Sequence, residues 1–256
     1  MSMEIFDLEG RTALVTGGSK GIGKAIATMF HAAGAEVMIA SRHRNQLDAA
    51  AEEIAGGTGG RVICHVADMT ERAEVQGLAE AAVAGLGQVD ILVNNAGANL
   101  PEPLHELTDA SWDRIVELNL TICTLLSRAL VPGMMARRWG RIIYTASMLG
   151  LAGSAARSVY CATKGALISM AHAQAVELGG FGITVNCVSP GPIMTDLPRS
   201  ILSETQRDAL AARTALGRWG EAQEVAGPVL LLASDAGAYM TGANLVIDGG
   251  VTINAY

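Results

Sequence analysis

The stretch TGGSKGIG (residues 16–23) joins a short apolar run, Thr12–Thr16, to a segment with helical periodicity at 21–33. Glycines in such a turn let the backbone approach a pyrophosphate, and the positive end of the following helix dipole favours the negative charge. The spacing is G-x-x-x-G-x-G rather than the more general G-x-G-x-x-G. A glycine-rich turn alone is a weak signal, but its place between a strand and a helix predicts a dinucleotide-binding loop.

Short β-branched runs alternate with helical stretches along most of the chain. The expected strands are Thr12–Thr16, Glu36–Ser41, Arg61–Val66, Val89–Asn94, Arg141–Thr145, Ile183–Val188 and Asn244–Asp248, and the expected helices are 21–33, 44–55, 71–85, 109–136, 158–178 and 222–233. Strands that alternate with helices of this length are typical of βαβ units in a mainly parallel sheet. Runs such as Ile91-Leu92-Val93 are apolar without alternation, as expected when helices cover both faces of the sheet. The sequence therefore predicts an α/β fold.

Length and composition favour a single domain over residues 1–256. Half of the residues are hydrophobic and only 4% are aromatic, so the core must consist mainly of Ala, Val, Ile and Leu. Neither a repeat nor a linker divides the chain. The alternation is interrupted only after Val188, and we expect the segment from about 192 to 220 to form a substrate lid, with a short helix at Ser203–Arg213.

Charge and residue usage exclude several classes of protein. The net charge is −7 and no basic run is present, which argues against nucleic-acid binding. No uninterrupted apolar stretch approaches the ~20 residues of a membrane span. Four widely spaced cysteines without a signal-peptide pattern indicate a cytoplasmic protein with reduced thiols. The five histidines lack metal-ligand spacing, so we expect no metal site.

The end of the second expected strand indicates which dinucleotide binds. An acidic residue there would bind the ribose 2′-hydroxyl of NAD and repel a 2′-phosphate. This chain has Ser41 and Arg42 instead, and Lys20 adds a second cation inside the glycine loop. Because a guanidinium and an ammonium suit a phosphate, the sequence favours NADP(H), with NAD(H) as the alternative.

Polar residues at the carboxyl ends of later strands suggest a proton-transfer site. Tyr160 and Lys164 are four residues apart in an expected helix and so share one face, where the ammonium favours the phenolate form. A Y-x-x-x-K pair alone is common by chance. Here Ser147 follows the fifth strand, and Asn119 stands in an apolar stretch of the preceding helix, where a polar residue requires an explanation. Ligands bind at this end of an open α/β sheet.

The order and spacing of these motifs resemble those of the classical subgroup of the short-chain dehydrogenases/reductases. The motifs are TGGSKGIG (16–23), NNAG (94–97), Asn119, Ser147, YCATK (160–164) and PGPIMT (190–195), and the likeness runs from Arg11 to the closing IDGG (247–250). The resemblance implies a Rossmann-type, doubly wound parallel sheet of seven strands with helices on both faces. It also implies a homotetramer that interconverts a ketone or aldehyde and an alcohol by hydride transfer.

The same resemblance assigns a role to each catalytic candidate. Tyr160 would be the general acid and base, Ser147 would hydrogen-bond the substrate oxygen, and Lys164 would bind the nicotinamide ribose. Asn119 would hold a water molecule of a proton relay that starts at Lys164. The residues expected to bind the cofactor are Gly17, Ser19, Lys20, Gly21, Ile22, Gly23, Ser41, Arg42, Asp68, Met69, Asn95, Ala96, Gly97, Tyr160, Lys164, Pro190, Gly191, Ile193 and Thr195.

The substrate itself is less well defined. Its pocket is expected to include Asn99, Met148, Leu149, Ser154, Arg157, Met194 and Leu197, with Arg157 as a candidate ligand for a carboxylate or phosphate. A small ketone, sugar or sugar acid would make the chain gluconate-5-dehydrogenase-like, and a 3-oxoacyl thioester would make it a carrier-protein reductase. Such reductases often present two basic docking residues; Arg138 matches one, but Phe181 occupies the other.

Two further classes are disfavoured. A non-catalytic dinucleotide sensor would be expected to lack Tyr160, Lys164 or Ser147, and all three are present. A sugar-nucleotide epimerase of the extended subgroup would have a differently spaced glycine loop and a longer chain.

Overall fold

Seven parallel strands form the central sheet, in the order β3-β2-β1-β4-β5-β6-β9. The structure is a computed structural model that describes residues 3–56 and 61–254. The strands are β1 (Thr12–Thr16), β2 (Glu36–Ser41), β3 (Val62–Val66), β4 (Ile91–Asn94), β5 (Gly140–Thr145), β6 (Ile183–Pro190) and β9 (Asn244–Ile247). Every residue of β1, β4, β5 and β6 is buried, which agrees with the expectation for the apolar run Ile91-Leu92-Val93 that helices cover both faces of the sheet. The predicted doubly wound sheet is confirmed.

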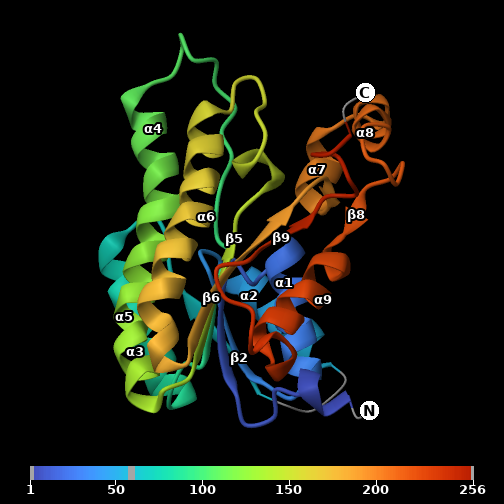
Figure 1. The fold of residues 1–256 in the computed structure, drawn as a ribbon. Helices are drawn as coiled ribbons and strands as arrows, with labels where there is room; N and C mark the ends of the chain where they lie inside the picture. The colour runs from blue at the N-terminus through green and yellow to red at the C-terminus, as the bar shows by residue number, and fades with distance from the viewer. Residues whose placement is uncertain (1–2, 57–60, 255–256) are drawn as a thin grey trace.

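Helices cover both faces of this sheet (Figure 1). One face carries α1 (Gly21–Ala32), α2 (Arg44–Ala55) and α9 (Ala222–Ala233), and the other carries α3 (Arg72–Leu86), α5 (Ile122–Arg137) and α6 (Ser158–Leu178). Successive strand residues point to opposite faces, so Leu14 and Leu92 belong to one buried cluster and Val15 and Val93 to the other. Each such buried side chain stabilises the fold by roughly 1.5–3 kcal/mol. The four cysteines are free.

The order of the strands changes direction between β1 and β4, and ligands bind at such a point in open α/β sheets. β1 pairs with β2 on one side and with β4 on the other. The chain leaves β1 for α1 on one face of the sheet, whereas it leaves β4 for the helices on the opposite face. The two connections therefore diverge, and they open a crevice at the carboxyl ends of the strands.

The helical run that was predicted as one element at 109–136 is interrupted. It consists of α4 (Asp109–Val116), a π-helical turn at Glu117–Thr121 and α5. Such wide turns inside a helix occur often at functional sites, and this one contains Asn119. By length and composition the run Asp109–Arg137 would suffice to cross a membrane, but Leu126 and Leu130 of α5 are buried in the core of this protein. The core helix of a soluble protein can have the same length and apolar composition as a helix that crosses a membrane.

The segment after β6 folds into small elements of its own. It contains β7 (Ile193–Met194), α7 (Asp196–Ile201), α8 (Glu204–Ala211) and β8 (Gly220–Glu221). The predicted helix at Ser203–Arg213 corresponds to α8, which begins with a reciprocal capping box between Ser203 and Gln206. The short helix α7 and the paired strands β7 and β8 were not predicted. In Figure 1 these elements lie together beyond the carboxyl ends of the strands.

Candidate active site

The glycine-rich loop packs the end of β1 tightly against the start of α1. Gly17 and Gly21 have φ angles of +65° and +53°, which favour glycine. A Cβ on Gly23 would collide with the carbonyl oxygen of Gly17, so no larger residue fits there. The side chain of Lys20, the N-cap of α1, makes no capping hydrogen bond. The first N–H groups of this helix are therefore suited to a pyrophosphate.

Asn95 connects this loop to the two neighbouring strands. Its side-chain amide donates to the carbonyl oxygen of Thr16 at 3.0 Å, and its backbone N–H donates to the Thr16 hydroxyl at 3.0 Å. Its side-chain oxygen accepts a hydrogen bond from the hydroxyl of Thr145 at 3.4 Å. The sequence predicted a cofactor contact at Asn95, and the structure shows that this side chain also fixes the loop.

Tyr160, Lys164 and Ser147 come together where β5 ends and α6 begins. The Nζ atom of Lys164 donates to the carbonyl oxygen of Thr145 at 2.6 Å and lies 5.7 Å from the centre of the Tyr160 ring. The Lys164 side chain is buried. The Ser147 hydroxyl accepts a hydrogen bond from the backbone N–H of Leu149 at 3.1 Å. A hydroxyl that accepts in this way still has its own hydrogen to donate.

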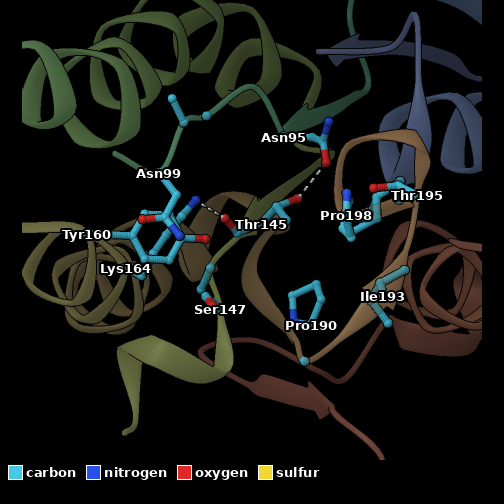
Figure 2. A pocket seen from close by; sticks show the side chains of 15 residues that line it. Asn95, Asn99, Thr145, Ser147, Tyr160, Lys164, Pro190, Ile193, Thr195 and Pro198 are labelled. Atoms are coloured by element: carbon cyan, nitrogen blue, oxygen red, sulfur yellow. Dashed lines mark hydrogen bonds between the residues drawn. The ribbon is translucent and has the colours of Figure 1, made fainter. Parts of the chain in front are cut away.

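These three side chains line one cavity of about 330 Å³. In Figure 2, Tyr160, Lys164 and Ser147 lie on one side of it, facing Ile193 and other side chains on the far side. The other predicted cofactor residues on its wall are Ile22, Asn95, Gly97, Pro190, Gly191, Ile193 and Thr195. Among the described residues that line this cavity, Lys164 alone carries a charge. The cavity therefore places a hydroxyl, a phenol and an ammonium around one space.

Asn119 lies behind this cavity rather than on its wall. Its side chain is fully buried, and it pairs with the backbone of Ala98 through two hydrogen bonds of 2.9 Å. Its amide also donates to the Thr163 hydroxyl at 3.3 Å. A Cβ on Gly97 would lie 3.0 Å from the Asn119 side-chain oxygen and 3.5 Å from Lys164 Nζ. Asn119 thus holds the loop after β4 against α6.

A second cavity of about 400 Å³ continues from the first on the other side of Gly97 and Ala98, which line both. Its wall includes eight of the residues that were predicted to bind the cofactor: Gly17, Ser19, Lys20, Ser41, Arg42, Asp68, Met69 and Ala96. The Ser41 hydroxyl oxygen is buried and has no partner among the described residues. An unpartnered hydroxyl beside the cations Lys20 and Arg42 fits a phosphate group on a ribose.

Asp68 is held in its charged form at this second cavity. Burial alone would raise the pKa of its carboxyl group, but hydrogen bonds from Thr70 and the charges of Arg42 and Arg114 outweigh burial and lower the pKa. The Thr70 hydroxyl and backbone N–H both donate to one Asp68 oxygen, at 2.8 and 2.9 Å. The second oxygen makes no hydrogen bond to the described residues, which leaves an acceptor for a ligand.

A third cavity of about 420 Å³ adjoins the catalytic one and shares Asn99 and Pro198 with it. The predicted substrate residues Asn99, Met148, Leu149, Ser154 and Arg157 line this cavity. Met194 does not, because β7 pairs it with Glu221 and it lines a separate cavity beside α1. The side chain of Leu197 lies outside the described residues.

The sequence did not identify several residues that the fold adds to these cavities. Thr145 supplies the acceptor for Lys164, but it is the last residue of a buried strand and looked like core. Arg213 and Trp219 reach the third cavity from the segment after α8, and Val251 and Thr252 reach it from the end of the chain. Long-range folding of irregular segments brings these together, so no local spacing indicated them.

The sequence resembles characterised proteins along almost its whole length. Residues 17–252 match the family model described as "Enoyl-(Acyl carrier protein) reductase". The 3-oxoacyl-[acyl-carrier-protein] reductase of Escherichia coli (strain K12) is 40% identical, over 96% of this chain and 98% of that protein. The 2-dehydro-3-deoxy-D-gluconate 5-dehydrogenase of Pseudoalteromonas atlantica is 37% identical, over 97% of this chain and 98% of that protein.

Solved structures agree with this likeness. A short-chain type dehydrogenase/reductase from Mycobacterium marinum superimposes with a TM-score of 0.91 at 39% identity, covering 98% of both chains. A 3-oxoacyl (acyl-carrier-protein) reductase from Agrobacterium tumefaciens C58 with NADP bound has a TM-score of 0.93 at 33% identity, also covering 98% of both chains. The chain therefore belongs to the short-chain dehydrogenase/reductase family and is an oxidoreductase of that family.

Proposed function

We propose that this oxidoreductase interconverts a carbonyl compound and an alcohol with NADP(H), using Tyr160 as the general acid and base. The observation that carries the proposal is the single cavity lined by Ser147, Tyr160 and Lys164, which continues into the cavity of Ser41 and Arg42. A nicotinamide cofactor, when bound, supplies the hydride for reduction or takes it up in oxidation. The side chains then have to bind the substrate oxygen and move one proton.

Ser147 and Tyr160 are suited to act on the substrate oxygen. The Ser147 hydroxyl lines the cavity and accepts from the backbone N–H of Leu149, so its own hydrogen is available to the substrate oxygen. Tyr160 donates its phenolic proton to the oxygen during reduction and takes it back during oxidation. Two donors bound to the same oxygen stabilise the negative charge that develops there.

Lys164 supports this proton transfer by its charge. One of its three N–H groups is bound to Thr145, so two remain for the cofactor ribose and the neighbouring Tyr160. The ammonium is buried and has no ion pair with the described residues, so solvent screens its field little. That field favours the phenolate after Tyr160 gives up its proton.

Asn119 is proposed to complete a proton path from Lys164. Its side chain is occupied by Ala98 and Thr163, so it would hold a water molecule through its backbone carbonyl in the π-helical turn. That carbonyl oxygen accepts a weak hydrogen bond from the Cys123 thiol at 3.5 Å, and its second lone pair would take the water. Its side chain would then position the loop around Gly97, and this loop would hold the cofactor at a fixed place relative to Lys164.

NADP(H) is the proposed cofactor because the second cavity offers cations and an unpartnered hydroxyl but no carboxylate at the end of β2. Lys20 and Arg42 have no ion pair with the described residues and are exposed, as a phosphate ligand requires. A solved relative, the reductase of Agrobacterium tumefaciens, binds NADP. NAD(H) is the alternative.

A small ketone, sugar or sugar acid is the proposed substrate. The segment 192–220 would act as its lid, because Pro198, Leu202, Arg213 and Trp219 line the third cavity. A 3-oxoacyl group on a carrier protein is the second candidate, favoured by the 40% identity to the Escherichia coli reductase. Arg138 is exposed as a docking residue would be, but the position of a second basic residue holds Phe181.

We further propose a cytoplasmic homotetramer. Outer faces of the helical layer around α6 carry exposed apolar side chains such as Val176 and Trp112, which a neighbouring subunit would cover. Light scattering tests this directly, and a monomer at micromolar concentration would contradict it.

The proposed function is tested by following the absorbance of the reduced cofactor with purified protein. Ketones, sugar acids and 3-oxoacyl thioesters are assayed with NADPH and with NADH, and the corresponding alcohols are assayed in the reverse direction. We expect carbonyl reduction to be faster with NADPH. A protein that binds NADPH tightly but turns over none of these classes would contradict the catalytic proposal.

A further inference from the structure

The third cavity has walls that are mostly apolar. The large apolar side chains on its wall are those of Met148, Leu149, Leu202, Leu210, Trp219 and Val251. The cavity adjoins the one lined by Tyr160 and shares Asn99 and Pro198 with it, so it is open to the remote part of a substrate whose oxygen lies at Tyr160. Its shape and lining therefore select the part of the substrate that does not react.

Two arginines interrupt this apolar surface. Arg157 and Arg213 both line the cavity, and no carboxylate side chain is among the described residues on its wall. Neither guanidinium group makes a hydrogen bond or an ion pair with the described part of the chain. By contrast, Arg218, which lies outside this cavity, forms two hydrogen bonds to the carboxylate of Glu224, at 2.6 and 2.7 Å. The cavity thus holds two uncompensated positive charges next to apolar walls.

The backbone before Arg157 is fixed in an unfavourable conformation. Ala156 has φ of +59°, in the left-handed region that costs a residue with a Cβ about 1–2 kcal/mol. Its carbonyl oxygen accepts a 2.7 Å hydrogen bond from the backbone of Glu102, in the loop after β4. Strain of this kind persists where the surroundings impose it, often at binding sites. Arg157 is the N-cap residue of α6 and precedes Tyr160 by only three residues. The position of its backbone relative to Tyr160 is therefore fixed by the first turn of this helix.

We propose that the substrate carries a carboxylate at the end remote from its reacting carbonyl, and that Arg157 and Arg213 bind this carboxylate. Guanidinium groups match a carboxylate through paired hydrogen bonds. Arg157 is half-buried and Arg213 is exposed, so both can reach a charged group at the open end of the cavity. The middle of the substrate is a hydrocarbon chain or ring that packs against Leu149 and Trp219. This inference rests on the proposed function, since it names the substrate class of the same site.

The test compares straight-chain oxo acids, with two to eight methylene groups between ketone and carboxylate, with their methyl esters in the presence of NADPH. The acid of best-fitting length is expected to have a kcat/KM roughly 10- to 100-fold above that of its ester, the gain typical of a hydrogen-bonded charge. Arg157→Met and Arg213→Met are expected to remove most of this preference, chiefly through a higher KM for the acid. The far-UV circular dichroism spectrum and the Kd for NADPH, which binds outside this cavity, show whether each variant is folded.

Arg199→Met is the matched control, because Arg199 lies on α7 but not on the cavity wall, and its replacement removes the same charge. It should leave the ratio of acid to ester unchanged. Two results would overturn the inference while the proposed reaction stands. One is equal turnover of acid and ester by the wild type, and the other is a preference for a 3-oxoacyl thioester over every free acid. Failure to reduce any carbonyl compound would reject the proposed function, and the inference with it.

Discussion

Lys164 Nζ donates a 2.6 Å hydrogen bond to the carbonyl oxygen of Thr145, which ties α6 to the last residue of β5. The hydroxyl of Thr145 in turn donates to Asn95, and the Asn95 amide donates to the carbonyl oxygens of Thr16 and Gly17. Hydrogen bonds therefore connect α6 across three strands to the glycine loop, and Figure 2 shows the two that join Lys164 to Thr145 and Thr145 to Asn95. The same residues thus position the proposed proton-transfer site and the glycine loop.

Lys164→Met should test how much of the catalysis depends on this ammonium. We expect kcat for alcohol oxidation at neutral pH to fall at least about 100-fold, because the developing phenolate loses its neighbouring positive charge. Lys164→Arg keeps the charge and should recover part of the loss. Lys24→Met serves as control, since Lys24 pairs with Glu53 on the surface; a loss of kcat as large as that of Lys164→Met would contradict the assigned role.

Tyr160→Phe removes the proposed acid and base while it keeps the ring. Turnover should fall by about 10²- to 10⁴-fold or more, the usual contribution of a general acid or base. The Kd for NADPH, measured by fluorescence titration, should change little. Tyr239→Phe is the matched control because Tyr239 is fully exposed, and it should retain wild-type kcat. Substantial turnover by Tyr160→Phe would require another proton donor.

Arg42→Asp should shift the cofactor preference from NADPH toward NADH. A carboxylate at the end of β2 would repel a 2′-phosphate and accept a hydrogen bond from a 2′-hydroxyl. The ratio of kcat/KM for the two cofactors is the measurement, and Arg61→Asp makes the same charge change at an exposed residue outside the second cavity. An identical ratio in wild type and Arg42→Asp would refute the assignment of NADP(H).

Gly23→Ala should disrupt the glycine loop. The added Cβ would collide with the Gly17 carbonyl oxygen and would lie 2.5 Å from the Asn95 amide nitrogen, so the loop must move. We expect weaker NADPH binding and a lower Tm. Gly77→Ala is the control: Gly77 lies within α3, where a Cβ meets nothing within 4 Å, and alanine there should stabilise the helix by roughly 0.5–1 kcal/mol. Tight NADPH binding by Gly23→Ala would contradict the role of the loop.

Much of this architecture could be predicted because local sequence determines it. The β-branched runs at Thr12–Thr16 and Glu36–Ser41 correspond to strands with those same bounds, since both faces of each strand are buried and the apolar pattern is unbroken. Tyr160 and Lys164 share a helix, so their spacing alone placed them together. The glycine spacing likewise reflects steric demands within a single turn.

The features that escaped prediction depend on contacts between distant segments. The π-helical turn contains Asn119, whose side chain pairs with the backbone of Ala98, 21 residues earlier, and no helical periodicity indicates such a long-range contact. The two-residue strands β7 and β8 are too short for a sequence pattern, yet Met194 lies in this pairing and lines a cavity beside α1 instead of the third cavity. Arg213 reaches the cavity only because the segment after α8 folds back over it.

Asp248 should make stability depend on pH in the acid range. Burial alone would raise the pKa of its carboxyl group, but hydrogen bonds from Thr252 and Gly250, of 2.6 to 2.9 Å, lower it below the usual value. The pKa of this carboxyl group is lower in the folded protein than in the unfolded chain, where it is about 3.9. The carboxylate therefore stabilises the fold fully above the unfolded-state pKa, and this stabilisation is lost as the pH falls through the folded-state pKa. These bonds hold the loop that carries Val251 and Thr252 to the third cavity.

Asp248→Asn should therefore lower the free energy of unfolding by about 1.5–3 kcal/mol at pH 7, the usual contribution of a hydrogen bond to a charged group. The difference from wild type should narrow as the pH falls from about 5 toward 2, because the wild-type carboxylate becomes protonated there. Urea unfolding at several pH values measures it. Asp113→Asn, at an exposed side chain of α4, should change stability little at any pH. A difference that widened with acidity would show that the Asp248 carboxylate does not stabilise the folded loop.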